Sequence, residues 1–210
     1  MKTRMSAGTN SRRLAPWLPL VLALWHGALE RPGSCQDSPT LPRGHVFFET
    51  DFEGAGGPRG WTRAGKLDIG CQSARALYFE RDADATGTTT LAEITLPVEQ
   101  MRGYDVYLAA MIKAANVSET PAQFHGIKFM TLAVQGTDKS YADAPLGLGT
   151  FDWKPGVFHA QVPHDVTAFS LLVGLQGVRG KAWFDNIKVT VRKPPRTAPP
   201  RAAGPVHKGH

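Results

Sequence analysis

Two segments that begin and end one β-rich stretch constrain the fold of this chain most. Residues 46–54 read VFFETDFEG, and residues 180–191 read GKAWFDNIKVTV. Both alternate apolar and polar side chains with the period of a strand that has one buried face. The first and last strands of antiparallel sandwiches are often neighbours, so we expect these two segments to lie side by side.

Short alternating runs, separated by Gly, Pro, Asn and Asp, fill the stretch between these segments. They show no clear helical periodicity, so the pattern predicts an all-β chain folded as an antiparallel β-sandwich. Residues 104–115 would also suit a helix, but their aromatic and β-branched start favours a strand. The expected strands cover residues 45–53, 75–80, 89–97, 105–115, 125–135, 157–162, 168–175 and 181–191.

The ends of the chain differ in composition from this β-rich stretch. Residues 1–35 combine a basic start with an apolar run over 14–29, which predicts a cleaved signal peptide and a secreted or periplasmic protein. The run is shorter than the roughly 20 residues of a membrane span. Alternatives are a start codon upstream of the true one and a retained amphipathic anchor. Residues 36–44 form an expected linker, 45–191 the domain, and 192–210 a Pro-rich disordered linker or tail.

The two cysteines, Cys35 and Cys71, are too far apart in sequence for a metal site. Small residues before Cys35 suggest a lipoprotein site, although Pro32 replaces the usual Leu. A disulfide is the second alternative, since export permits one. The third is that Cys35 leaves with the leader and Cys71 remains as an unpaired, buried small hydrophobe.

The overall basic charge comes from the ends of the chain. Residues 36–191 hold fourteen Lys and Arg against seventeen Asp and Glu, a net charge of −3, whereas the whole chain carries +6. The expected folded part is therefore mildly acidic, and we expect no nucleic-acid partner.

Catalytic motifs are not evident. The sequence holds no GxSxG elbow, phosphate loop or Cys-x-x-Cys motif. His125, His159 and His164 are spread over separate expected strands or turns, and no pair of carboxylates is singled out for glycosidic hydrolysis. We therefore expect a protein that is not an enzyme.

The end segments carry a family resemblance. The run Asp51-Phe52-Glu53, closely followed by Trp61, and the run Trp183-Phe184-Asp185 resemble the ends of jelly-roll carbohydrate-binding modules of the galactose-binding-like superfamily. Such modules are found N-terminal to glycoside hydrolases. The resemblance covers residues 45–191 and implies a jelly-roll fold with a sugar-binding role.

The resemblance also implies a structural calcium ion. In the resembled modules a Glu of the opening segment and an Asp of the closing segment share it, which gives Glu53 and Asp185 here; Asp51, Glu80 and Asp82 are further candidates. Carboxylates are the hard oxygen ligands that calcium prefers. Asn186 stands where the family often has a second Asp. The alternative is that Glu53 and Asp185 are ordinary surface acids.

A sugar-binding face needs flat aromatic rings for stacking and amides for hydrogen bonds to hydroxyls. Trp153 is the first candidate because a turn at Pro155-Gly156 would expose its ring, and Tyr141 lies in the preceding loop-like stretch, 136–150. A Trp near a turn is also often a core residue, and Trp61 and Trp183 are expected in the core. The candidate residues are Trp153, Tyr141, Gln135 and Gln176.

These observations predict a non-catalytic, exported carbohydrate-binding module that holds a polysaccharide or oligosaccharide by aromatic stacking. One alternative is the N-terminal accessory part of a truncated glycoside hydrolase, because a Pro-rich linker ordinarily connects two domains and the final residues look like the entry to a family 5 cellulase-like barrel. Its catalytic domain would then be the partner. The other alternative is a structural or interaction sandwich without a ligand.

Overall fold

The structure is a computed structural model that describes residues 40–54, 58–82, 89–120 and 122–195. The chain divides into two units, Met1–Ser38 and Pro39–His210, and every described residue belongs to the second. The predicted signal peptide over residues 1–35 and most of the predicted tail lie outside the described residues.

The described residues form β-strands and one short helix. In the interval between β4 and β5, α1 makes a single turn that buries Met101. The elements are β1 (Val46–Thr50), β2 (Lys66–Asp68), β3 (Ala76–Arg81), β4 (Thr89–Thr95), α1 (Val98–Met101), β5 (Asp105–Val117), β6 (Gly126–Gln135), β7 (Asp138–Asp143), β8 (Gly149–Gln161), β9 (Ala168–Gln176) and β10 (Gly180–Lys193).

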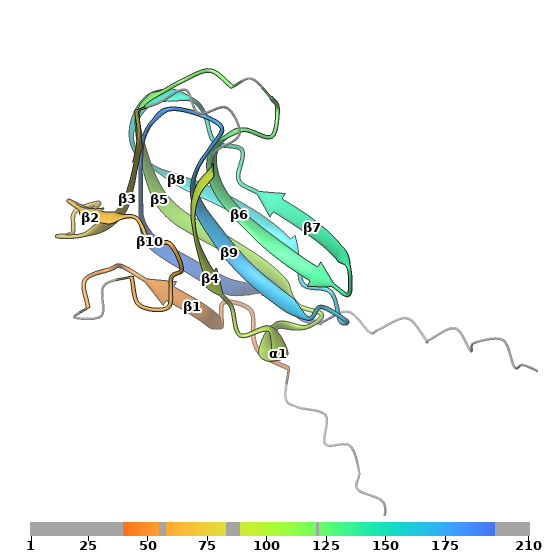
Figure 1. Ribbon diagram of the computed structural model, residues 1–210. Helices are drawn as coiled ribbons and strands as arrows, with labels where there is room; N and C mark the ends of the chain where they lie inside the picture. The colour runs from red at the N-terminus through yellow and green to blue at the C-terminus, as the bar shows by residue number, and fades with distance from the viewer. Residues whose placement is uncertain (1–39, 55–57, 83–88, 121, 196–210) are drawn as a thin grey trace, which may run out of the picture. The chain divides into compact units, whose positions relative to one another are not determined.

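The strands form two antiparallel sheets that face each other as a sandwich (Figure 1). One sheet has the order β2-β3-β10-β5-β8, with β1 also paired to β10, and the other has the order β4-β9-β6-β7. The predicted all-β sandwich is confirmed. The expected contact of the end segments is confirmed as well, because Glu49 of β1 lies opposite Lys188 of β10 in an antiparallel ladder.

Alternation along the strands places one set of side chains between the sheets. In β10, Ala182 and Phe184 point into this core, and in β6 Phe129 does the same. Phe184 packs edge-on against Phe79 of β3, with ring centroids 5.9 Å apart, and Phe129 packs likewise against Phe158 of β8 at 5.1 Å. Apolar area removed from water in this layer is the main term that stabilises the sandwich.

Trp183 corrects a prediction, because it does not belong to the core. Its neighbours Ala182 and Phe184 point inward, so the strand period turns Trp183 to the outer face. There its ring packs on Tyr78 with centroids 5.0 Å apart, and its indole N–H donates to Asp68 Oδ2 over 2.8 Å. Trp61, by contrast, is buried in the core as expected.

Two strands were not predicted from the sequence. β2 has only exposed residues, and β7 is polar and exposed over nearly its whole length, so neither carries the apolar alternation of a half-buried strand. β7 occupies part of the expected loop at 136–150 and ends the four-stranded sheet. At the corresponding end of the other sheet, β8 contains Pro155, which has no N–H to offer.

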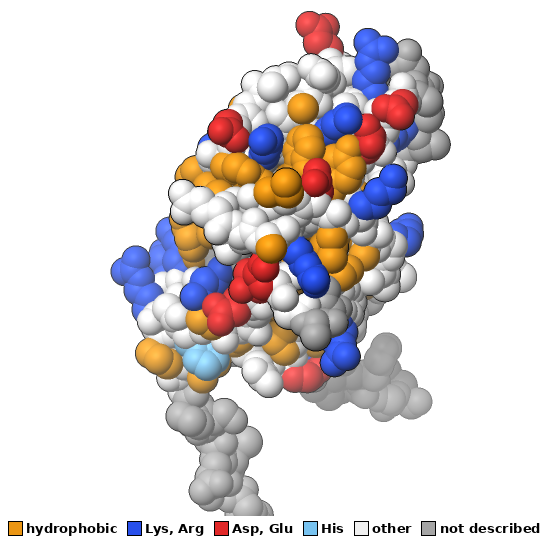
Figure 2. All heavy atoms as spheres, turned by 90° about the vertical axis from the view of Figure 1, so that its left-hand side faces the viewer, with side chains coloured by type: hydrophobic (Ala, Val, Ile, Leu, Met, Phe, Trp, Pro, Cys, Tyr) orange, Lys and Arg blue, Asp and Glu red, His pale blue; other side chains and the backbone are white. Residues whose placement is uncertain are grey.

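Charges of both signs are interspersed with apolar side chains on the face beside β1 and β2, as Figure 2 shows. Ion pairs join charged side chains of β1, β3 and β10: Lys188 Nζ lies 3.1 Å from Glu49 Oε2, and Lys181 Nζ lies 2.7 Å from Glu80 Oε1. This face therefore offers mixed charge rather than one continuous basic surface.

The core arrangement predicts a large difference between Phe184 and an exposed apolar residue of the same sandwich. Phe184→Ala should lower the free energy of unfolding by about 3–5 kcal/mol, because it removes a fully buried ring and leaves a cavity. Val157→Ala on the exposed side of β8 is the matched control and should change it by less than about 0.5 kcal/mol. Urea unfolding measures both, and equal effects would contradict the placement of Phe184.

Candidate functional site

The four-stranded sheet carries a cluster of apolar side chains on its outer face as well as on its inner face. In β6 Phe129 points into the core, while Met130 and Leu132 point to the opposite face. There Met130 forms a second apolar cluster with Leu91 of β4 and Leu172 of β9. In a two-layer sandwich the outer face of a sheet is ordinarily polar, so an apolar outer face indicates a surface that binds something.

A groove of about 770 Å³ runs over this outer face. Its floor comes from β4, β6 and β9, one wall from β7 and the other from the turn that precedes β6. We call it the sheet groove. Its lining residues are Leu91, Gln123, Phe124, Lys128, Met130, Leu132, Tyr141, Asp143, Leu172 and Gln176.

Two exposed aromatic side chains stand at opposite ends of the sheet groove. Phe124 is 64% exposed and precedes β6, whereas Tyr141 is 59% exposed and lies opposite Leu132 near the other end of β6. Leu132 lies six positions after Gly126 along β6, so the strand rise places the two ends on the order of 20 Å apart. Exposed rings over an apolar floor suit an elongated ligand with flat apolar faces.

Phe124 is supported by the residue that follows it. Its ring meets His125 edge-on, with centroids 4.6 Å apart. His125 in turn lies against Gly177, where any Cβ would overlap the imidazole and where φ is +61°. Glycine at this position therefore leaves the space in which His125 supports the wall of the groove.

The polar groups of the sheet groove lie in two places, at the Phe124 end and between the two aromatic side chains. Gln176 pairs with Gly126 in the ladder, so it lies at the Phe124 end. Between the two aromatics, Lys128 Nζ lies 3.3 Å from Asp143 Oδ2. The Lys128 side chain is only 8% exposed and that of Asp143 is 54% exposed, so a buried ammonium meets a half-exposed carboxylate at the foot of one wall.

The structure brings together two of the four residues predicted to bind sugar. Tyr141 and Gln176 both line the sheet groove. Gln135 does not line it, and its amide donates to Asp165 Oδ1 over 2.7 Å at the end of β6. Trp153 lies half-buried on β8 in the other sheet, where Asp152 and Trp153 together face Lys113 in a bulge.

Sequence reasoning missed Lys128, Asp143 and the apolar floor, and it gave Phe124 no special weight. A signal for the floor is present in the sequence. The stretches IKFMTLAV and SLLVGL are apolar in both phases of the strand period, which a half-buried strand does not require. Asp143 carries no such signal, because it lies in a stretch that was expected to be a loop.

Two of the residues predicted to bind calcium, Glu53 and Asp185, accept hydrogen bonds from the same loop. Glu53 Oε1 accepts the backbone N–H of Arg75 over 2.6 Å. Asp185 Oδ2 accepts the backbone N–H of Cys71 over 2.8 Å and the hydroxyl of Ser73 over 2.6 Å. The carboxylates of the opening and closing segments therefore both hold residues 70–75, although they are far apart in sequence.

Oxygen atoms crowd around Gly70 in this loop. A Cβ at Gly70 would overlap Ser73 Oγ and the carbonyl oxygen of Arg75, and it would lie 2.6 Å from Asp185 Oδ2. Asp185 is fully buried, and it has no ion-pair partner among the described residues. The Asp185 carboxylate accepts three hydrogen bonds, from the backbone N–H groups of Cys71 and Asn186 and from the Ser73 hydroxyl. The Ser73 and Arg75 oxygens beside it are hard ligands of the kind that calcium prefers.

Two further observations concern this loop: the side chains available to a metal ion and the state of Cys71. Within the described ranges no group of three or more His, Cys, Asp or Glu side chains could hold a metal ion, so backbone and hydroxyl oxygens would have to complete the site. Cys71 is a half-buried free thiol. Burial raises the pKa of this thiol, and the negative charge of Asp185 raises it further.

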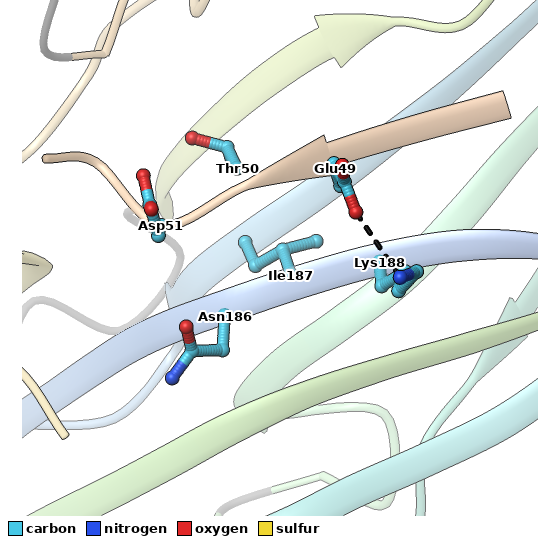
Figure 3. Close-up of a pocket in the computed structure, with 6 residues that line it drawn as sticks. All are labelled: Glu49, Thr50, Asp51, Asn186, Ile187 and Lys188. Atoms are coloured by element: carbon cyan, nitrogen blue, oxygen red, sulfur yellow. Dashed lines mark ion pairs between the residues drawn. The ribbon is translucent and has the colours of Figure 1, made fainter. Parts of the chain in front are cut away.

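Asp51 lines a polar hollow, which Figure 3 shows. The hollow has a volume of about 460 Å³ and lies between the end of β1 and the bulged part of β10. Its other lining residues include Asn186 and the ion pair of Glu49 with Lys188. Asp51 Oδ1 accepts the backbone N–H of Glu53 over 3.0 Å, which fixes the turn that follows β1.

Solved structures of carbohydrate-binding modules share this fold. A xylan-binding domain from carbohydrate-binding family 22 is 17% identical, with a TM-score of 0.52 over 71% of this chain and 97% of that one. The C-terminal family 22 module of Clostridium thermocellum Xyn10B is 14% identical, with a TM-score of 0.50 over 70% of this chain and 92% of that one. Neither a protein-family model nor a curated protein matches the sequence.

A third similar structure contains the N-terminal family 22 module and the GH10 module of Clostridium thermocellum Xyn10B in complex with xylohexaose. It is 12% identical, with a TM-score of 0.50 over 71% of this chain and 29% of that one. At these identities the likeness establishes the fold: this domain is a β-sandwich of the kind found in carbohydrate-binding modules. The resemblance stated from the end segments is confirmed at this level. None of the described helices is long and apolar enough to cross a membrane.

The Lys128–Asp143 pair predicts an asymmetric response to substitution. Asp143→Ala should lower the free energy of unfolding by about 1–3 kcal/mol, because it leaves a buried ammonium without its partner. Lys128→Met should leave stability unchanged or raise it, because it replaces a buried charge with an apolar side chain of similar length. Urea unfolding measures both, with Asp138→Ala on the exposed start of β7 as control. Equal losses for Asp143→Ala and Lys128→Met would contradict the asymmetry.

Proposed function

We propose that this domain is a non-catalytic carbohydrate-binding module that holds a polysaccharide chain along the sheet groove. The observation that carries the proposal is the pair of exposed rings, Phe124 and Tyr141, at opposite ends of an apolar groove. Xylan-binding in the name of one similar structure and xylohexaose in another support a polysaccharide as the class of ligand.

The groove would bind a glycan mainly through the apolar faces of its sugar rings. The C–H faces would stack on Phe124 and Tyr141, each contact contributing about 1 kcal/mol on the scale of aromatic pairs. Met130, Leu132 and Leu172 would cover the apolar edge of the chain between these contacts. Because the rings lie at opposite ends of the groove, an extended chain would gain both contacts, whereas a single sugar would gain one.

Two amides supply hydrogen bonds at the Phe124 end. Gln123 and Gln176 both line the groove there, and each amide carries two donors and an acceptor for sugar hydroxyls. A sugar hydroxyl both donates and accepts, so an amide matches it in either direction. These groups would fix the orientation of the chain and leave most of the binding energy to the stacked rings.

The domain would act as an exported module tethered to another domain or to a surface. Weak single contacts gain avidity when a tether raises the local concentration of the ligand. In the similar Xyn10B structure a carbohydrate-binding module is joined to a GH10 module, which supports a glycoside hydrolase as the class of neighbour. The exposure of Tyr141 speaks against a sandwich without any ligand.

This proposal predicts that the two groove aromatics carry the binding. Tyr141→Ala and Phe124→Ala should each weaken binding about fivefold, because each removes a stacking contact of about 1 kcal/mol. The measurement is retardation of the full chain in native gels that contain xylan, mannan or a β-glucan.

Two controls locate the site. Tyr107→Ala removes a comparably exposed ring from the other sheet and should not change binding. Trp153→Ala tests the first candidate of the sequence. If Trp153→Ala abolished retention while Tyr141→Ala did not, the site would lie on β8 instead of the sheet groove.

A structural calcium ion is a further part of the proposal. Glu53 and Asp185 would hold it together with oxygens of residues 70–75, and it would offset the charge of the buried Asp185. When bound, the ion would supply a rigid link between the segment after β1, the loop before β3 and β10. It would have no part in sugar chemistry, since Asp185 and Glu53 do not line the sheet groove.

Chelation should then lower the melting temperature. At a calcium concentration a hundredfold above its dissociation constant, the ion adds about 2.7 kcal/mol to the free energy of unfolding, and a chelator removes this term. The double substitution Glu53→Gln, Asp185→Asn keeps the shapes of both side chains and should abolish the response to chelator. Glu49→Gln alters the nearby hollow and should retain it. A wild-type melting temperature that the chelator leaves unchanged would exclude the ion.

A further inference from the structure

The Lys128–Asp143 pair is the one charged feature in the lining of the sheet groove, as far as the described residues show. Its position is unfavourable for stability. Lys128 lies opposite Gly174 in the ladder, next to the apolar cluster of Met130 and Leu172. Taking a charge out of water costs free energy that one partner at 3.3 Å only partly returns. An apolar residue would suit this floor better, so the pair indicates a role in binding.

The pair has hydrogen-bonding capacity left over. An ammonium group has three N–H donors, and within the described part of the chain Lys128 Nζ has one partner, Asp143 Oδ2. The Asp143 side chain remains 54% exposed, so its carboxylate also has lone pairs free to accept hydrogen bonds. A donor and an acceptor thus stand side by side at the foot of the β7 wall.

The pair lies next to a stacking ring. Asp143 and Tyr141 are two residues apart on the same face of β7, about 7 Å along the strand. A sugar chain that stacks on Tyr141 would therefore bring the hydroxyls of the same or the next unit to the pair. Among the described lining residues, the other end of the groove has Phe124 and the amides of Gln123 and Gln176, none of which is charged.

The charges of the pair cancel. An anionic sugar that approached Lys128 would also approach the more exposed carboxylate of Asp143, and the two effects would oppose each other. Two adjacent hydroxyls of a neutral sugar suit both members at once, because one hydroxyl can accept from Lys128 while its neighbour donates to Asp143. A hydroxyl that carries an acyl group has no proton to donate to the carboxylate.

We propose that Lys128 and Asp143 together recognise two adjacent free hydroxyls on a neutral sugar unit, so that the sheet groove selects unsubstituted neutral glycans over acylated or anionic ones. This inference rests on the proposed function, since it concerns the same groove. It assigns the choice among glycans to the ion pair and leaves the general affinity for glycans to the two aromatic rings.

The test compares glycans and variants in native affinity gels with the full chain. The probes are deacetylated xylan, glucomannan and barley β-glucan, the same three glycans after chemical acetylation, and polygalacturonate as an anionic glycan. The test variant is Lys128→Met, Asp143→Leu, which removes both charges and should fold because it leaves neither charge alone. Glu49→Gln, Lys188→Met removes the ion pair between β1 and β10 and is the matched control. Tyr141→Ala reports on the groove itself.

The wild type should bind at least one deacetylated glycan about tenfold or more tightly than its acetylated form, and tighter than polygalacturonate. The double variant at Lys128 and Asp143 should lose most of this preference, with the deacetylated glycan bound about tenfold more weakly. The control pair should behave as the wild type does. Because the charges of the pair cancel, added salt should change the binding of neutral glycans little.

Three results would overturn the inference. If the double variant kept the wild-type affinity and preference while Tyr141→Ala weakened binding, the proposed function would stand and the role of the pair would fail. Tighter binding of polygalacturonate than of every neutral glycan would mean that Lys128 selects negative charge. If no probe retarded the wild type, or if Tyr141→Ala bound as the wild type does, the proposed groove would fail and the inference with it.

Discussion

The pairing of β10 is the constraint on which the rest of the sandwich depends. Along one edge, β10 pairs first with β3 and then with β1, and along the other edge it pairs with β5. The change of partner between β3 and β1 falls at Asp185 and Asn186, where the register shifts and Asn186 adopts a positive φ of 49°. At this interruption the backbone lacks a strand neighbour, and the side chain of Asp185 holds residues 71–73 in its place. The Asp185 side chain thus links β10 to the loop before β3 at the point where β10 changes partner along this edge.

The two faces of the four-stranded sheet divide structure from function. The inner face packs against the six-stranded sheet and supplies the burial that holds the fold together. The outer face carries a second cluster of apolar side chains, and beside it a buried charge whose removal from water costs free energy. Such a face costs solubility and stability unless it is used. This balance, more than any single residue, places the candidate site on β6 and β9.

Strand existence was predictable because β3, β4, β5, β6, β9 and β10 each bury residues with a regular period. β2 and β7 were not predictable, since a strand exposed on both faces leaves no apolar pattern. The same reason governs the site. Tyr141 and Gln176 were predicted from the chemistry of their side chains alone. The ion pair of Lys128 with Asp143 could not be predicted in this way, because it depends on the pairing of β6 with β7. Trp153 was predicted to bind sugar because a turn at Pro155 would expose its ring. That proline instead lies within β8, and the strand continues through it.

The strands β7 and β8, each at one edge of its sheet, also affect how this domain behaves at high local concentration. β7 is polar along its exposed length, with Lys139 and two aspartates, and β8 contains Pro155, which has no N–H to donate to a neighbouring strand. Open strand edges otherwise recruit one another into continuous sheets. Molecules gathered on a single polysaccharide would reach local concentrations far above those in solution. These two edges would let many copies stand side by side there without joining into aggregates.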